Sequence, residues 1–212
     1  MMEHLVTVTV PAETTALVTL DRVKAELGIT TTEHDALLAA KIAEASADIE
    51  AHVGYRLARE TVTETFWDMD WSTAYVLLDR TPVASIAGVI LDGWGQETSA
   101  WRLNPETGAL YALTGSGTPW HWIASNSLVV AYSGGYLLPG QTGRDLPAPL
   151  EGAAADLVGM FWQSRGRDPS LRAETVDGVG RLEYWVGTVG REGSLPPLVM
   201  QKIAPFVRPR IA

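Results

Sequence analysis

The histidines are the first candidates for chemistry in this sequence, because an imidazole can bind a metal ion or carry a proton near neutral pH. The four histidines are His4, His34, His52 and His121. None has a second histidine at the His-x-x-x-His spacing that places two metal ligands on one helical face. His34 and His52 fall in the first and last turns of one predicted helix, far apart along its axis. The sequence therefore predicts no metal-binding or catalytic histidine.

Asp68 and Asp70 form the best local pair of carboxylates, within the run Trp67-Asp-Met-Asp-Trp71. Two carboxylates at this spacing in a loop are suited to calcium. The run lacks the remaining oxygen ligands and the glycine of an EF-hand loop. We interpret it as a solvated turn that is anchored by its two tryptophans.

The motifs of other enzyme classes are also missing. Gly178-Val-Gly180 has no third glycine at the spacing of a dinucleotide-binding turn, no P-loop occurs, and no serine has the nucleophile-elbow pattern. The chain has no cysteine, which excludes disulfides, thiolate zinc sites and a cysteine nucleophile. We expect a protein that is not an enzyme, with no catalytic residue, no metal and no cofactor. A hydrolase built on scattered carboxylates stays an alternative.

The charge of the chain restricts its partners. The formal net charge is −9. Because phosphate contacts come from Lys and Arg, such a chain does not bind nucleic acid through its overall field. An acidic surface does suit nucleic acid that must pass without sticking. The first twenty residues lack the basic start of a signal peptide, and no stretch approaches the roughly 20 apolar residues of a membrane span.

Helical patterns occur on both sides of a β-rich middle. Residues 19–54 predict a helical hairpin, with Thr19 as the first N-cap and with Gly28 and Gly54 as the two stops. The second helix has an apolar stripe at spacings of three and four, which is typical of an amphipathic helix. The stripe consists of Leu38, Ile42, Ala45, Ile49 and Val53. A further helix from Pro149 to near Gly166 has an apolar face of Leu150, Ala154, Leu157, Val158, Phe161 and Trp162.

The residues between these helices predict strands. Short β-branched runs alternate with turn signals, and Glu60–Phe66 is the clearest strand. The predicted fold class is α+β: a small helical bundle core with an inserted antiparallel β lobe and an extended C-terminal tail. We assign residues 1–57 and 135–168 to the helical core, 58–134 to the β lobe, and 169–212 to a Gly-rich loop and the tail.

The tail is basic and apolar on an otherwise acidic chain, and four prolines interrupt it. It predicts one or two helical turns and then, after Pro205, an extended tail. This tail is either a disordered end or, given the resemblance described below, an arm that docks on a neighbouring chain. The residues predicted to dock are Leu198, Val199, Ile203, Phe206, Arg208 and Arg210. The cations Arg165 and Arg167 near the end of the preceding helix either suit the helix dipole or, together with Asp168, form contacts between subunits.

The eight tryptophans leave a second function open. Tryptophan is common in sheet cores, in interfaces and in ligand platforms. A binding module is the alternative, in which the Trp67–Trp71 run and Trp120-His-Trp122 of the β lobe hold a carbohydrate or a peptide.

Several segments occur in a characteristic order: Leu20–Leu27, Glu33–Asp35 with the Ala-rich helix through Glu50, Gly54–Leu57, Asp79–Val83, Val129–Tyr136 and Leu146–Arg165. This order resembles the head–tail connector, or adaptor, family of tailed bacteriophages and gene transfer agents. The resemblance spans about residues 17–168.

The resemblance implies a structural protein of the virion, made in the bacterial host cytoplasm and located at the head–tail junction. It implies a ring of copies, usually twelve, between the portal protein and a tail-side stopper or tail terminator protein. The C-terminal segment is then expected to reach into the portal, so that removal of residues 195–212 abolishes portal docking and leaves the fold intact. DNA is expected to pass through the central channel without sequence-specific binding, and no membrane is involved.

Overall fold

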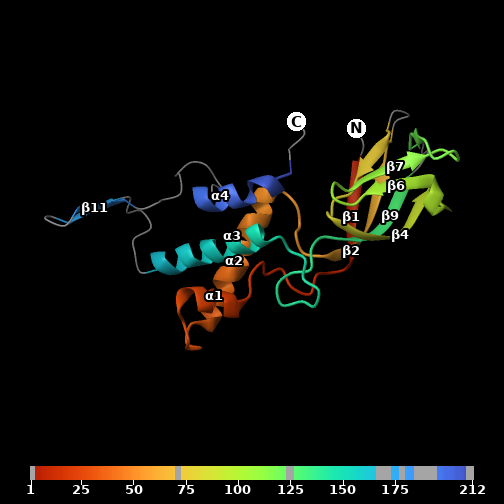
Figure 1. Cartoon of the computed structure of the whole chain (residues 1–212). Helices are drawn as coiled ribbons and strands as arrows, with labels where there is room; N and C mark the ends of the chain where they lie inside the picture. The colour runs from red at the N-terminus through yellow and green to blue at the C-terminus, as the bar shows by residue number, and fades with distance from the viewer. Residues whose placement is uncertain are drawn as a thin grey trace. The chain divides into compact units, whose positions relative to one another are not determined.

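The computed structural model describes residues 3–69, 73–122, 127–165, 173–176, 180–183 and 195–208. The chain forms two compact units, each built from two stretches of sequence (Figure 1). The β unit contains Met1–Thr14 and Tyr55–Leu137, and the helical unit contains Thr15–Gly54 and Leu138–Ala212. The predicted α+β class is confirmed.

The helical unit begins with the predicted hairpin. Thr19 Oγ1 accepts a hydrogen bond from the Arg22 backbone N–H at 3.3 Å, and Gly28 ends the first helix with φ +67°. None of the described helices is long and apolar enough to cross a membrane. The helices are α1 (Leu20–Leu27), α2 (Asp35–Val53), α3 (Ala148–Ser164) and α4 (Pro197–Ile203), and a 3₁₀ turn, η2, covers Ala204–Phe206.

Helix α3 packs against α1, α2 and α4. The predicted apolar stripe of α2 is buried, with each of its five residues at most 4 % exposed. The predicted face of α3 is buried at Leu150, Ala154, Leu157 and Val158, and half-buried further along the helix at Phe161 and Trp162. Both sequence patterns therefore mark the helical core.

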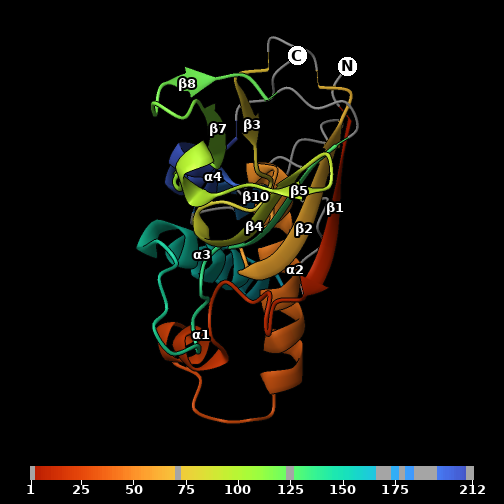
Figure 2. The same ribbon diagram turned by 90° about the vertical axis from the view of Figure 1, so that its right-hand side faces the viewer.

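The β unit has two antiparallel sheets (Figure 2). The larger sheet has the order β1 (Glu3–Val10), β2 (Glu60–Trp67), β9 (Leu128–Gly134), β4 (Val83–Leu91) and β5 (Trp94–Gly95). The smaller sheet has the order β3 (Tyr75–Leu77), β7 (Ala109–Leu113) and β6 (Trp101–Asn104), with β8 (Pro119–Trp120) also paired to β7 and the 3₁₀ turn η1 (Thr98–Ala100) before β6. One apolar cluster with residues from both sheets forms the core.

The predicted domain boundaries placed residues 1–57 in the helical core. The position of strand β1 differs from this prediction. The strand pairs antiparallel with β2, with Val6 opposite Glu64, so residues 1–14 belong to the β unit. The partner strand lies more than 50 residues away in the sequence. Local patterns carry no signal for a pairing at that separation.

A carboxylate is buried in the β core. Glu64 is fully buried, and its Oε2 accepts hydrogen bonds from the Tyr132 hydroxyl at 2.8 Å and the Asp79 backbone N–H at 3.1 Å. The Tyr132 oxygen in turn accepts the Arg80 backbone N–H at 3.0 Å. Glu64 Oε1 lies 3.7 Å from His4 Nε2 on β1. Desolvation raises the pKa of Glu64 above its ordinary value, because burial penalises the charged carboxylate.

We expect Glu64→Gln to stabilise the β unit increasingly as the pH rises. A carboxyl whose folded pKa is raised binds its proton more tightly in the folded state, so ionisation lowers the stability between the unfolded and the folded pKa. Glutamine keeps an oxygen for Tyr132 and Asp79 and cannot ionise. Urea unfolding from pH 4 to pH 8 measures the effect, and a constant difference between variant and parent contradicts it. Tyr132→Phe is the opposite variant: it removes the hydroxyl that donates to the Glu64 carboxylate, so the pKa of Glu64 rises further and the loss of stability grows as the pH rises.

Candidate functional site: the C-terminal segment and its supports

Helix α4 is amphipathic although it is short. Pro196 and Pro197 begin it, where a missing N–H costs nothing. Val199 and Ile203, spaced by four, have no exposed surface, whereas Leu198 is 50 % exposed. The helix therefore buries one edge in the helical unit and presents the other to solvent.

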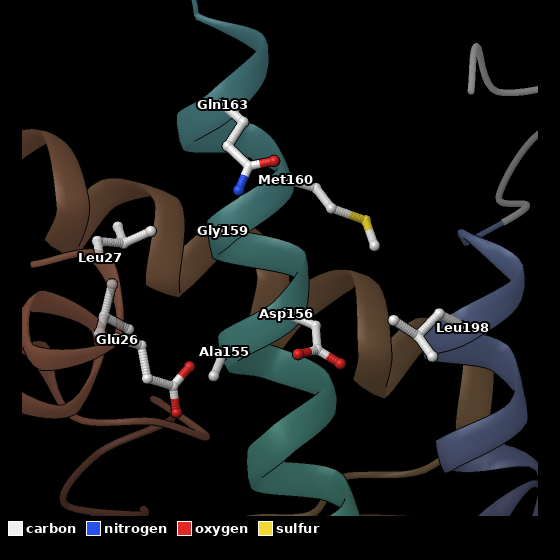
Figure 3. A pocket seen from close by; sticks show the side chains of 9 residues that line it. Glu26, Leu27, Ala155, Asp156, Gly159, Met160, Gln163 and Leu198 are labelled. Carbon is white, nitrogen blue, oxygen red and sulfur yellow. The ribbon is translucent and has the colours of Figure 1, made fainter. Parts of the chain in front are cut away.

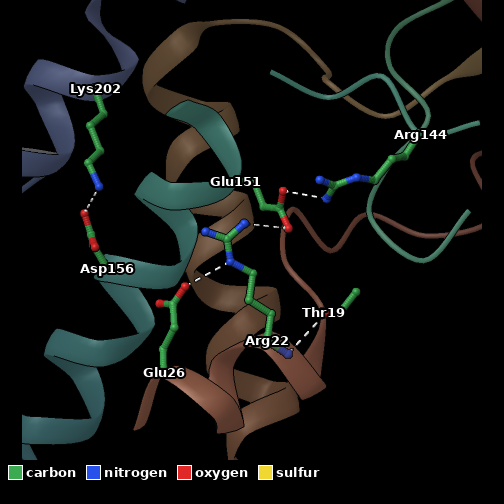
Figure 4. Close-up of polar contacts among 7 residues, drawn as sticks. All are labelled: Thr19, Arg22, Glu26, Arg144, Glu151, Asp156 and Lys202. Atoms are coloured by element: carbon green, nitrogen blue, oxygen red, sulfur yellow. Dashed lines mark hydrogen bonds and ion pairs between the residues drawn. The ribbon is translucent and has the colours of Figure 1, made fainter. Parts of the chain in front are cut away.

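Two polar contacts support this placement. Lys202 Nζ forms an ion pair with Asp156 Oδ2 on α3 (Figure 4). Beyond η2, the Arg208 backbone N–H donates to the Val53 carbonyl at 3.0 Å, in the last turn of α2. The chain is thus held to α3 and α2 as far as Arg208.

The six residues predicted to dock fall into three groups. Val199 and Ile203 are core residues of the helical unit, so in this conformation they anchor α4. Leu198 is exposed, and Phe206 and Arg208 are half-buried near the exposed Val207. Arg210 lies outside the described residues. The one or two helical turns predicted before Pro205 are confirmed by α4, but the sequence did not show that Val199 and Ile203 are buried.

A second support is an ion cluster that the sequence analysis missed. Glu151, only 2 % exposed, accepts from Arg22 Nη1 at 2.9 Å and from Arg144 Nη1 at 2.6 Å (Figure 4). Arg22 Nε also contacts Glu26 at 2.9 Å. The hydrogen bonds to Glu26 and Glu151 raise the pKa of Arg22. The cluster joins α1, the first turn of α3 and the loop before it. Arg22 and Glu26 are a local pair, four residues apart, but no local motif indicates that Arg22 also reaches Glu151.

A shallow pocket lies between α1, α3 and α4 (Figure 3). Its volume is about 280 Å³. Its two carboxylates are neutralised, since Glu26 contacts Arg22 and Asp156 contacts Lys202. The described residues contain no group of three His, Asp or Glu side chains placed to hold a metal ion. The lining is Val23, Glu26, Leu27, Ala155, Asp156, Gly159, Met160, Gln163 and Leu198.

Of the three residues predicted for subunit contacts, Arg165 can be located. It follows the last turn of α3, and its guanidinium lies 3.3 Å from the centroid of the Trp162 ring. His34 packs edge-on against the same ring, with centroids 5.0 Å apart. Arg167 and Asp168 lie outside the described residues. The assignment of these three residues to contacts between subunits stays a prediction.

The tryptophans of the alternative ligand site have different environments. Trp122 is 1 % exposed and donates its Nε1–H to the Leu110 carbonyl at 2.9 Å, so it is a core residue. Trp120 is 52 % exposed on β8 of the smaller sheet, and Trp67 is 36 % exposed on β2 of the larger sheet. Trp71 lies outside the described residues. The Trp120-His-Trp122 half of that site is therefore divided between surface and core.

The comparisons with known proteins agree with the resemblance seen in the sequence. Residues 17–75, which run from the segment before α1 to the start of β3, match the model of the phage gp6-like head–tail connector family. No curated protein matches the chain. Among solved structures, a chain in the neck of an empty gene transfer agent particle, computed with C6 symmetry, shares the fold with a TM-score of 0.60 at 17 % identity. A neck structure of the native particle with C12 symmetry matches at 16 % identity and the same TM-score. Each alignment covers 98 % of this chain and 97 % of the other.

We expect Glu151→Ala to destabilise the helical unit more than Arg144→Ala. Removal of Glu151 breaks both ion pairs at once. The expected loss of stability is limited to about 1–3 kcal/mol, because the two arginines are partly exposed and regain water. Removal of Arg144 leaves Arg22 in place and costs less than about 1 kcal/mol. Thermal unfolding followed by circular dichroism measures both. Equal losses for the two variants would show that Glu151 is not the centre of the cluster.

Proposed function

We propose that this chain is a non-enzymatic subunit of a head–tail connector, located at the head–tail junction of a virion. Copies form a ring between the portal protein and a tail-side protein, and DNA passes through its centre. The fold carries the proposal: it is shared along almost the whole length of this chain with a chain in the neck of a gene transfer agent.

A ring of twelve is consistent with the symmetry of the similar neck structure. A ring needs two different complementary surfaces on each subunit, and it closes when the rotation per subunit divides the circle. With a net charge of −9 on each copy, a ring carries a strong negative field. Such a field repels the DNA backbone and favours passage over binding.

The tail is proposed to contact the portal through its exposed part. Val199 and Ile203 hold α4 in the helical unit, and Leu198, Phe206, Arg208 and Arg210 supply apolar and basic groups at and beyond it. A short segment that leaves an anchored helix loses less conformational entropy on docking than a free arm does. The anchored helix therefore supports docking by the segment after Phe206.

The ring is tested with the purified protein and its cognate portal ring. We expect electron microscopy to show an added collar with cyclic symmetry on the portal, and light scattering to give the mass of that collar. Absence of a collar, with both proteins folded, contradicts the proposed function.

The tail is tested by two truncations. Removal of residues 207–212 spares α4 with its buried Val199 and Ile203 and removes one backbone hydrogen bond, from Arg208 N–H to the Val53 carbonyl. We therefore expect a folded subunit that no longer docks on the portal. Removal of residues 195–212 also deletes Val199 and Ile203 and is expected to destabilise the helical unit by about 2–5 kcal/mol, as for lost core side chains. This differs from the intact fold that the sequence alone predicted for the longer truncation.

A charge reversal refines the tail experiment. Arg210→Glu is expected to weaken portal binding, whereas Arg102→Glu, an equal change at an exposed position of β6, is expected to leave it unchanged. Co-sedimentation with the portal ring measures both. Equal losses of portal binding for the two variants would indicate a general effect of charge and would contradict docking through the tail.

A further inference from the structure

The strands β10 (Ala173–Val176) and β11 (Gly180–Glu183, labelled in Figure 1) form a two-stranded hairpin. They pair antiparallel, from Ala173 opposite Glu183 to Val176 opposite Gly180. Within the described residues they make a sheet of two strands, with no third strand hydrogen-bonded to either. A two-stranded hairpin of this length is at best marginally stable by itself, and the outer backbone groups of both strands need partners.

Strand β1 is an incomplete edge of a different kind. It is eight residues long and lies at the margin of the larger sheet, paired on one side with β2 (Figure 2). Leu5, Val8 and Val10 are each more than 40 % exposed. The strand contains no lysine, arginine or proline, and its acidic residue Glu3 and its register shift between Val8 and Val10 lie at its two ends. Such residues and irregularities commonly keep an edge strand from pairing with another chain.

We propose that the β10–β11 hairpin of one copy pairs with the β1 edge of a neighbouring copy and extends its five-stranded sheet by two strands. Addition of strands to an exposed edge is a common mode of recognition, in which the backbone supplies the hydrogen bonds. This inference rests on the ring of the proposed function.

A second copy is the partner because one chain carries both halves of the contact. The hairpin belongs to the helical unit and β1 to the β unit, so donor and acceptor are different surfaces. A contact between two different surfaces of identical chains is heterologous, and it passes from copy to copy until the ring closes. Each hairpin strand has four residues, which is half the length of β1. The edge is therefore long enough to accept the whole hairpin.

Cross-linking tests the pairing, and the absence of cysteine in the chain makes the test specific. Thr7→Cys places a thiol at an exposed position of β1, and Thr175→Cys places one in β10. The two single variants, one with a size tag, are mixed and assembled on the portal. We expect a short bismaleimide to join tagged to untagged chains. Ser116→Cys, exposed in the turn between β7 and β8, replaces Thr7→Cys in the control and is expected to give no such product.

The outcomes separate this inference from the function on which it rests. Assembled rings without the Thr7–Thr175 product overturn the pairing and leave the connector role intact. A double variant that cross-links within single dilute chains, and not between chains in the ring, also overturns it, since the hairpin then pairs within its own chain. Failure of the parent protein to form a ring removes both proposals.

A pair of lysine variants gives an independent readout. Thr7 and Thr63 are opposite each other in the β1–β2 ladder, so they lie on the same face of the sheet, one at the edge and one a strand inward. Thr7→Lys is expected to reduce ring formation at least about tenfold, because a charge at the edge opposes strand addition. Thr63→Lys is expected to change it little. Equal losses of ring formation for the two variants would indicate a contact through the sheet face and would overturn the edge pairing. Intact rings for Thr7→Lys would also overturn it.

Discussion

The packing of α3 is the constraint on which the helical unit depends. The elements that α3 brings together come from both ends of the sequence, because the β unit lies between α2 and α3 in the chain. Buried alanines at 153, 154 and 155 allow close approach, and Leu150, Leu157 and Val158 supply the larger buried surface. An inserted lobe is tolerated because the two stretches of the helical unit meet on this one helix.

Glu151 shows how a charge is accommodated in that packing. A buried carboxylate is costly unless it is paired, and here two guanidiniums satisfy its two oxygens from different segments. Its position in the first turn of α3 adds the favourable helix dipole. Because both arginines reach water, the ion cluster contributes little to the free energy of unfolding. Its main effect is to orient the segments that it joins. It fixes how α1 and the loop before α3 meet the helix, and so sets the frame on which α4 packs.

The sequence predicted those parts of the fold that depend on neighbouring residues. The cap at Thr19, the stop at Gly28 and the apolar stripe of α2 are local, and all three are confirmed. The pairing of β1 with β2 and the contact of Arg22 with Glu151 depend on residues far away in the chain, and no local pattern indicated them. In the candidate site the tail was recognised by its composition. The division between the buried Val199 and Ile203 and the exposed Leu198 follows from tertiary contacts with α3, which periodicity over seven residues cannot establish.

Unpaired strand edges deprive a chain of hydrogen bonds that a neighbouring chain can supply. Among the described residues, β10 and β11 pair only with each other and β1 pairs only with β2, so each forgoes hydrogen bonds that a further strand would supply. If the hairpin and β1 complete each other between copies, the free energy of pairing is gained at assembly, and a closed ring leaves no copy with an unfilled edge. An open arc always leaves one donor and one acceptor unpaired. The proposed pairing would thus favour closed rings over open arcs.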